Sequence, residues 1–308
     1  MSEGFWAAVV QAPVEVITDP SRREEVIRAN CTRAIRLMET ILAVSPHPPR
    51  LFQFPVLLLQ GAYNEARSPE ARAAIAIELP GPELTPLLEW CAAHQVYLAS
   101  SCVERHPALP GWTFHSGMLL GPEGVLLRSP KAQARSAAGI HIIKDYYAEY
   151  TALFGREAVF PVVATPLGRL ALCVEAEVLV PEVARVVAAR GAEVLLHPTV
   201  ERPERRPWAY RAAKVARAVE NRLYLLSANV GGSLIRDPQR GVDSYQRAAG
   251  GSLVVDYEGM VRCEVEGSGE GWATAYIDLP ALRAARALPA PEIEFTPLLY
   301  REVYCREA

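Results

Sequence analysis

Apolar runs alternate with segments of helical periodicity along the N-terminal half of the chain. Short apolar runs bounded by Pro, Gly or polar clusters predict strands, here over 5–13, 51–59 and 95–104. Apolar side chains at intervals of three and four predict helices over 23–44 and 83–94. The segment 114–129 is typical of two strands joined by a Gly-Pro-Glu-Gly turn. Helices between strands, followed by a hairpin, predict helices packed outside mixed sheets.

Length and composition are typical of one large domain. The chain has 308 residues, of which 50% are hydrophobic, and this is enough to bury a full core. No internal repeat or low-complexity linker divides it, so we expect one domain over 1–287 and a C-terminal tail over 288–308. The six cysteines are scattered without C-x-x-C pairing, which predicts reduced thiols.

Charge and hydropathy argue against several classes of partner. The net charge of -3 gives no electrostatic basis for binding nucleic acid, and the basic run 201–208 is interrupted by acids and prolines. No segment has the order of a signal peptide, and no apolar run approaches the ~18 to 20 residues of a membrane span. We therefore expect a cytoplasmic protein without a membrane partner. No cluster of His, Cys and Asp has ligand spacing, so we expect no metal and no cofactor.

The segment 168–182, GRLALCVEAEVLVPE, carries the most informative motif. Its glycine, apolar strand, acids and final Pro-Glu resemble the catalytic strand and elbow of the nitrilase (carbon–nitrogen hydrolase) superfamily. In that pattern the strand is followed by Cys, an aromatic residue, an acid and Pro-Glu. Without gaps, the ends of the pattern fall on Gly168 and on Pro181 with Glu182, and its cysteine falls on Glu175. The nearest thiol, Cys173, lies two residues earlier.

Further segments are similar to the same superfamily in order and spacing. LFQFPVLLLQGAY (51–63) resembles the strand that ends in Phe-Pro-Glu, with Val56 in the position of the catalytic glutamate. GPEGVLLRSPKAQ (121–133) resembles the segment of the catalytic lysine, which falls on Lys131. Later motifs of the superfamily are matched by 191–199, 217–232 and 250–261. The resemblance implies an α/β fold, a four-layer α-β-β-α sandwich with two sheets between two pairs of helices.

Hydrolysis of an amide or nitrile through a thioester needs a thiolate, a base and a cation that stabilises the oxyanion. The resemblance assigns these roles to Cys, Glu and Lys, whose positions here hold Glu175, Val56 and Lys131. Valine moves no proton, and a carboxylate is a weaker nucleophile than a thiolate. We therefore expect a catalytically silent or divergent protein with a binding or assembly role, by itself or beside an active paralogue. Because a buried lysine needs a partner, we predict an ion pair between Glu175 and Lys131.

A second register leaves an active hydrolase open. If Cys173 and Glu175 match the Cys-aromatic-Glu order of the superfamily, the chain is an amidase, nitrilase or carbamoylase. Cys173 is then the nucleophile, Lys131 stabilises the oxyanion, and Glu175 or Glu149 is the base. Residues two apart on a strand point to the same face, about 6.6 Å apart, so Cys173 and Glu175 would both face the pocket. The competing interpretations are a buried core thiol for Cys173 and a solvated helix face for Glu149.

Other polar residues near these motifs have less specific interpretations. His197 follows an apolar run and is either a pocket residue or a hydrogen-bonded structural histidine. We expect His115 and Ser116 to cap a turn, and Lys144 to face solvent.

The resemblance also implies self-association. We expect a homodimer or higher homo-oligomer formed through the helices after the elbow, over 181–191 and 207–221. The small apolar stripe available for close packing there consists of Val183, Ala184, Val187 and Ala188. The ligand or substrate that the resemblance implies is a small molecule with an amide, nitrile or carbamoyl group.

Overall fold

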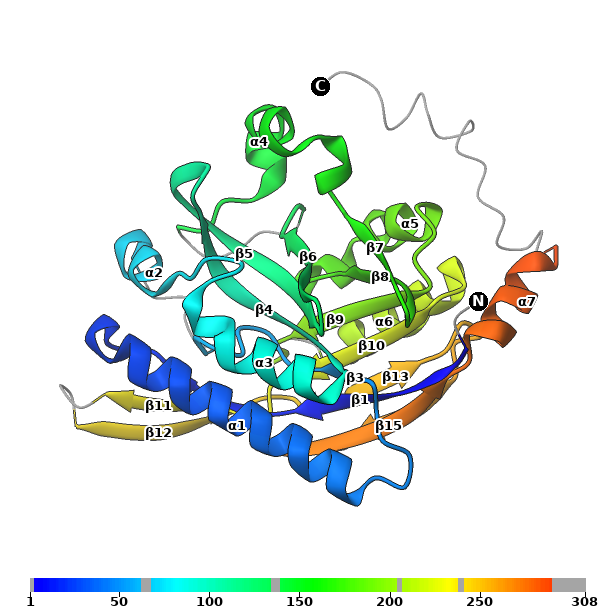
Figure 1. Ribbon diagram of the computed structural model, residues 1–308, viewed down its shortest axis with the longest axis horizontal. Coiled ribbons are helices and arrows are strands. Elements are labelled where there is room, and N and C mark those ends of the chain that lie inside the picture. The colour runs from blue at the N-terminus through cyan, green and yellow to red at the C-terminus, as the bar shows by residue number, and fades with distance from the viewer. Residues whose placement is uncertain (1–2, 62–67, 134–138, 204–206, 238–240, 290–308) are drawn as a thin grey trace.

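Two six-stranded sheets form the centre of the molecule, for which the computed structural model describes residues 3–61, 68–133, 139–203, 207–237 and 241–289 (Figure 1). The first sheet has the order β15 (Gly271–Ile277), β1 (Phe5–Gln11), β3 (Leu51–Gln53), β4 (Tyr97–His106), β5 (Leu109–Gly121), β6 (Gly124–Pro130). The second has the order β14 (Val261–Val265), β13 (Ser252–Val255), β10 (Tyr224–Asn229), β9 (Val194–Thr199), β8 (Gly168–Leu172), β7 (Val162–Thr165). A smaller sheet joins β12 (Val242–Arg247), β11 (Gly232–Asp237) and β2 (Pro13–Val16).

Both large sheets are mixed, as the alternation of helices and hairpins predicts. The strands β1, β3 and β4 run parallel in the first sheet, and β8, β9 and β10 run parallel in the second. The flanking strands pair antiparallel.

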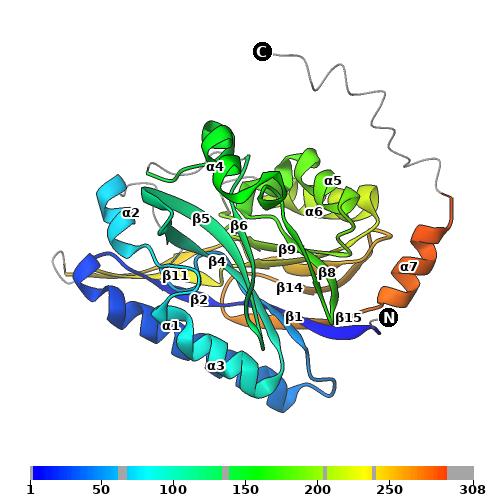
Figure 2. The same cartoon turned by 45° about the horizontal axis from the view of Figure 1, so that its top comes forward.

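Helices cover the outer face of each large sheet. The first pair, α1 (Arg23–Val44) and α3 (Thr85–His94), packs on the first sheet, and α5 (Pro181–Ala189) and α6 (Pro207–Asn221) pack on the second (Figures 1 and 2). The other helices are α2 (Pro69–Ile75), α4 (Tyr147–Phe154) and α7 (Leu279–Ala287). Short 3-10 segments are η1 (Pro20–Arg22), η2 (Pro82–Leu84), η3 (Ile143–Tyr146), η4 (Arg156–Ala158) and η5 (Glu175–Leu179). The layers therefore have the expected α-β-β-α order.

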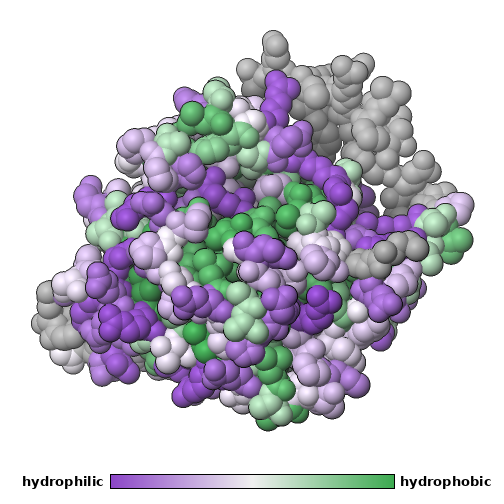
Figure 3. Space-filling view, viewed as in Figure 1, coloured by the Kyte–Doolittle hydropathy of each residue, from purple (hydrophilic) through white to green (hydrophobic). Residues whose placement is uncertain are grey.

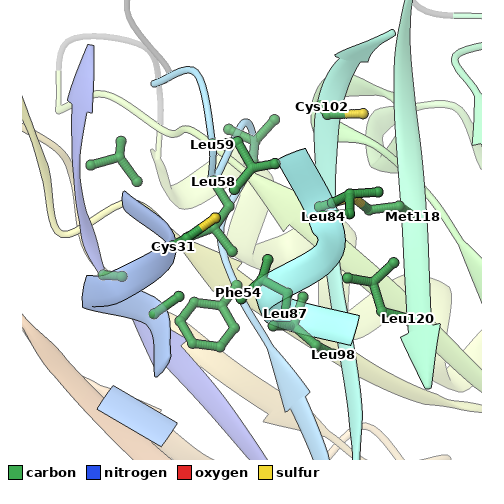
Figure 4. Packing of buried hydrophobic residues seen from close by; sticks show 14 of the residues in the cluster. Cys31, Phe54, Leu58, Leu59, Leu84, Leu87, Leu98, Cys102, Met118 and Leu120 are labelled. Carbon is green, nitrogen blue, oxygen red and sulfur yellow. The ribbon is translucent and has the colours of Figure 1, made fainter. Parts of the chain in front are cut away.

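Separate apolar clusters fill the spaces between these layers. Ala7 and Val9 of β1 belong to the cluster between the two sheets, whereas Ala8 and Val10 belong to the cluster beneath α1 and α3. Both faces of β1 are thus buried, which explains its nearly continuous apolar sequence. Figure 4 shows the cluster beneath the helices, including Cys31, Phe54, Leu87, Leu98 and Met118. In the space-filling view, apolar residues gather towards the middle of one face and hydrophilic residues surround them (Figure 3).

Most elements predicted from periodicity are confirmed. The helix expected over 23–44 is α1, with the same bounds, and the helix expected over 83–94 begins two residues later as α3. The hairpin expected over 114–129 is formed by β5 and β6, with β5 beginning earlier, at Leu109.

The strand expected over 51–59 is wrong beyond its first three residues. β3 ends at Gln53, and Leu57 has the positive backbone angle φ of 51°, which is incompatible with an extended strand. Pro55 has no N–H to donate to a neighbouring strand, so the ladder cannot continue there. The apolar run is nevertheless buried, because Val56, Leu58 and Leu59 turn into the cluster beneath α1 and α3. Burial, rather than sheet pairing, therefore accounts for its composition.

The apolar stripe of α5 does not form a free surface. Val183, Ala184 and Val187 are fully buried against the second sheet, in a cluster with Leu195 and Leu225. The expectation that this stripe packs across a dimer is therefore wrong. A helix that packs on a sheet needs an apolar face that contributes to the core of its own chain. From sequence alone, such a face looks the same as one that packs against a second molecule.

The remaining expectations concern the ends of the chain and membranes. α7 ends at Ala287, directly before the expected tail, whose residues from 290 onwards lie outside the described ranges. Among the described residues, no helix is long and apolar enough to cross a membrane.

Candidate functional site

Lys131, His115 and Glu175 form a polar cluster between the two large sheets. Lys131 directly follows β6, and its backbone N–H donates to the carbonyl oxygen of His115 on the neighbouring strand β5 (2.9 Å). Glu175 comes from the other sheet, three residues after β8. Gly117 on β5 allows the two sheets to approach here, since an added Cβ would lie 3.1 Å from the Val174 side chain and 3.2 Å from that of Leu172.

The chain makes a sharp bend at residues 173–177, which we call the elbow. Glu175 has a φ of 52°, in the left-handed region that non-glycine residues rarely occupy. Such backbone strain persists only where surrounding contacts impose it, and it is frequent at functional sites. Here Glu177 supplies contacts, because its carboxylate accepts hydrogen bonds from the backbone N–H groups of Val174 (3.1 Å), Ala132 (2.7 Å) and Gln133 (3.1 Å). The carboxylate of Glu177 therefore connects the segment after Lys131 to the elbow through hydrogen bonds.

The ion pair predicted between Lys131 and Glu175 is confirmed. Lys131 Nζ lies 2.7 Å from Glu175 Oε2, and the two side chains are 1% and 23% exposed. Burial raises the pKa of Glu175, but Lys131 and then His115 outweigh it and lower that pKa from 4.5 to about 2. The carboxylate is therefore ionised at neutral pH and compensates the buried ammonium.

His115 is the third member of the cluster. Its Nδ1 lies 3.6 Å from Glu175 Oε2, and its Nε2 lies 2.9 Å from Ser101 Oγ on β4. Ser101 Oγ also accepts a hydrogen bond from the backbone N–H of Leu57 (3.0 Å). Burial lowers the pKa of His115 to about 4, so the ring is neutral at pH 7. The expectation that His115 and Ser116 cap a turn is wrong, because both lie within β5 and are buried.

His197 contacts the backbone of the elbow. Its Nε2 lies 2.9 Å from the carbonyl oxygen of Glu175, and its Nδ1 lies 2.9 Å from Ser227 Oγ. The ring is fully buried, and burial followed by the charge of Lys214 lowers its pKa to about 3. Of its two interpretations, the structure supports the hydrogen-bonded structural histidine. The imidazole ring provides a hydrogen-bond partner for the backbone carbonyl oxygen of Glu175 in the elbow.

Cys173 and Glu175 do not face the same pocket. Cys173 is fully buried with Ala171 and Leu195 in the cluster beneath α5 and α6, whereas Glu175 contacts Lys131 between the sheets. The strand rule fails because β8 ends at Leu172 and the backbone changes direction before Glu175. Burial, followed by the charge of Glu177, raises the pKa of the Cys173 thiol well above its ordinary value of 9.0.

The two other candidates, Val56 and Glu149, are not partners in the ion pair. Val56 is fully buried in the apolar cluster beneath α1 and α3, and its side chain has no polar group that could form a hydrogen bond or an ion pair. Glu149 lies on the exposed face of α4, and Lys144 is exposed as expected. Glu149 therefore does not orient Lys131 in this structure.

Several residues of this region were not identified from the sequence. Glu177 had a usable signal, because it stands two residues after Glu175, where the family pattern places its acid. A second buried ion pair, Lys214 to Glu201 (2.7 Å), joins α6 to the segment after β9 and had no local signal. Within the described ranges, no group of three or more His, Cys, Asp or Glu side chains has the arrangement of a metal site.

The fold and the elbow define a class of protein: a four-layer α-β-β-α sandwich with a strained, charged turn after β8, the strand next to the edge strand β7 of the second sheet. Residues 7–287 match the carbon–nitrogen hydrolase family, and the chain belongs to that family. Nitrilase 3 of Arabidopsis thaliana is 25% identical over 252 residues, covering 77% of this chain and 67% of that protein. A formamidase of Bacillus cereus is 27% identical over 234 residues, covering 74% of this chain and 63% of that protein. The match thus spans about two thirds of the length of these relatives.

Solved structures show the same fold. A carbon–nitrogen hydrolase from Helicobacter pylori has a TM-score of 0.72 at 19% identity, over 99% of this chain and 100% of that one. Saccharomyces cerevisiae Nit3, a member of the nitrilase superfamily, has a TM-score of 0.69 at 20% identity, over 94% of this chain and 96% of that one. A double mutant of the amidase from Nesterenkonia sp., in complex with acrylamide, has a TM-score of 0.65 at 22% identity, over 98% of each chain.

Proposed function

We propose that this carbon–nitrogen hydrolase family member does not form a thioester with its ligand, and that its site binds a small polar molecule without hydrolysing it. The observation that carries the proposal is the 2.7 Å contact between Glu175 Oε2 and Lys131 Nζ at the elbow. A thioester mechanism needs a thiolate beside this cation, and a carboxylate is there instead.

The groups of the site do not supply the three roles of thioester chemistry. Glu175 is held as an anion with a pKa of about 2, so it is a weak base as well as a weak nucleophile. Lys131 already compensates that charge and is less available to an oxyanion. Val56 cannot transfer a proton. The alternative nucleophile, Cys173, is fully buried on the helix side of the sheet, where its thiol is protonated at neutral pH. A hydrolase based on Cys173 is therefore disfavoured.

The ion pair itself offers a means of recognition. Glu175 is 23% exposed, so its carboxylate can accept a hydrogen bond from a ligand N–H, and the ammonium of Lys131 can donate to a neighbouring carbonyl oxygen. A carboxamide or carbamoyl group carries this donor and acceptor side by side. The relatives named above include a nitrilase, a formamidase and an amidase in complex with acrylamide, which supports the same class of ligand. A pseudoenzyme with such a site would serve as a ligand-binding or assembly subunit, as a homo-oligomer or beside an active paralogue.

The proposal is tested by measuring turnover and binding on the same protein. Wild-type protein should release no ammonia above background from formamide, acetamide, acrylamide, propionitrile or N-carbamoylglycine. The amides should nevertheless raise its melting temperature, because a ligand that binds only the folded state stabilises it. Glu175→Gln should abolish that stabilisation, and the same change at the exposed Glu149 should not. Ammonia release that Cys173→Ala abolishes would show an active hydrolase instead.

A further inference from the structure

The strand β12 forms an exposed edge of the small sheet. Among the strands of the described residues, only β11 pairs with it, since the order of that sheet is β12, β11, β2. The ribbon of β11 and β12 extends to the left margin of the molecule in Figure 1. Side chains of β12 are half-buried at Gln246 and exposed at Asp243, Ser244, Tyr245 and Arg247. The outer edge of β12 therefore offers backbone N–H and C=O groups to a further strand.

We propose that β12 pairs antiparallel with β12 of a second copy of this chain, about a two-fold axis that passes Tyr245. Tyr245 then lies opposite Tyr245 of the partner subunit, and Asp243 lies opposite Arg247 of the partner subunit. A two-fold contact uses the same surface on both copies, so the strand must be complementary to itself. This surface is separate from α5 and α6, and the inference does not depend on the proposed ligand site.

The charges of β12 are complementary in this register. Asp243, Tyr245 and Arg247 are two residues apart and share one face of the strand. Antiparallel pairing about Tyr245 gives two opposite-charge pairs, one on each side of the two tyrosines, and such pairs stabilise a sheet. Pairing about Ser244 or Gln246 would leave both charges without an opposite charge across the strands. Parallel pairing in register would place like charges opposite each other, which is destabilising. The charges therefore select the antiparallel arrangement about Tyr245.

Both charges remain available for a partner subunit. Arg236 of β11 lies opposite Asp243, but its Nη1 lies 3.7 Å from Glu15 Oε2 on β2. Arg247 lies opposite Gly232, which has no side chain to pair with it. Within the ranges that the structure describes, neither Asp243 nor Arg247 takes part in an ion pair. Contact with a second β12 would thus form ion pairs without breaking existing ones.

Tyr245 gives the centre of the contact a fixed aromatic surface. Its hydroxyl donates a hydrogen bond to the carbonyl oxygen of Gly231 (2.6 Å). Gly232 leaves room for the ring to lie across β11, since an added Cβ there would be 2.2 Å from ring atoms of Tyr245. The side chain nevertheless remains 44% exposed. An aromatic side chain that is already held in place loses little conformational freedom on binding, so Tyr245 favours association.

Exchange of the two charges tests the register. Asp243→Arg places two arginines opposite each other twice in the contact, and Arg247→Asp does the same with two aspartates. Each single variant should raise the dissociation constant of self-association by roughly 10-fold or more, measured by sedimentation velocity over a concentration series. The double variant restores opposite charges and should associate like wild type. Asp145→Arg, the same change at another exposed aspartate, should have no effect. Single variants that associate like wild type, or a double variant no better than the single ones, would overturn the proposal.

A cross-linking measurement leaves the charges and Tyr245 intact. In the proposed pairing Ser244 lies opposite Gln246 of the partner subunit, so a mixture of Ser244→Cys and Gln246→Cys proteins should form a disulfide between these positions on oxidation, identified by mass spectrometry. Neither variant alone should form it, because two copies of one position are diagonal neighbours about 7–8 Å apart, beyond the reach of a disulfide. Wild-type protein under the same oxidant controls for the native thiols. A mixture without this disulfide would overturn the proposal, as it would if β12 paired with a strand of another protein.

Discussion

Glu175→Gln removes the negative charge that Lys131 faces and is the most direct test of the electrostatics of the elbow. Glutamine has nearly the same shape, so the packing around the elbow changes little, but Lys131 remains 1% exposed without its counter-ion. Breaking a buried pair by removing one partner is costly because an uncompensated charge is left behind.

The magnitude follows from the pKa of the carboxyl group. A fall from 4.5 to about 2 corresponds to about 3 kcal/mol, since each pKa unit is worth about 1.4 kcal/mol. For an acid whose folded pKa is depressed, this stabilisation is fully present above the unfolded pKa and is lost as the pH falls through the folded value. The variant should therefore be about 3 kcal/mol less stable than wild type at pH 7, and the difference should shrink between pH 4.5 and pH 2.

The assay is urea unfolding of both proteins at several pH values, followed by circular dichroism. Glu149→Gln is the matched control, because it makes the same chemical change on the exposed face of α4 and should alter stability by no more than about 0.5 kcal/mol. In a double-mutant cycle with Lys131→Met, the two changes should be clearly non-additive. Equal stability of Glu175→Gln and wild type at pH 7, or a difference that does not depend on pH down to 3, would refute the reasoning.

Three further predictions concern thiol reactivity, the pH dependence of stability, and self-association. Iodoacetamide at neutral pH should modify the partly exposed Cys263 before the fully buried Cys173, as mapped by mass spectrometry; rapid modification of Cys173 would restore it as a nucleophile. His115 and His197, whose pKa values are lowered from 6.5 to about 4 and about 3, should each make the protein less stable by about 1.4 kcal/mol per pH unit as the pH falls below 6.5, because the unfolded chain takes up protons that the folded chain excludes. In urea titrations at several pH values, His115→Gln should reduce the loss of stability per pH unit by the contribution of one histidine. The same change at the exposed His47 should not reduce it. Light scattering at micromolar concentration should give the mass of a homodimer, whereas a monomer would show that the expected association does not occur.

Family membership and most of the local structure can be predicted from the sequence alone. The motifs around Gly168, Lys131 and Pro181 depend on short-range spacing, which a sequence displays directly. The helix over 23–44 was recognisable because its apolar residues repeat with the period of a helix. The pairing of Lys131 with Glu175 was also predictable, although 44 residues separate them, because a buried cation requires a nearby anion.

Which face each residue occupies depends on how the layers pack in the folded chain. Period and spacing show that side chains share a face, but not which layer covers that face. A stripe that packs on the core, as on α5, therefore cannot be distinguished by sequence from one that packs across a dimer. The interpretation of Cys173 as a buried core thiol is confirmed, whereas the shared face of Cys173 and Glu175 in the second register is wrong, because a backbone change at Glu175 ends the alternation of the strand. His115 had no local signal at all, since its partners Ser101 and Glu175 come from another strand and from the opposite sheet. The polar surroundings of the elbow exist because the two sheets pack face to face, and that packing is a property of the folded chain.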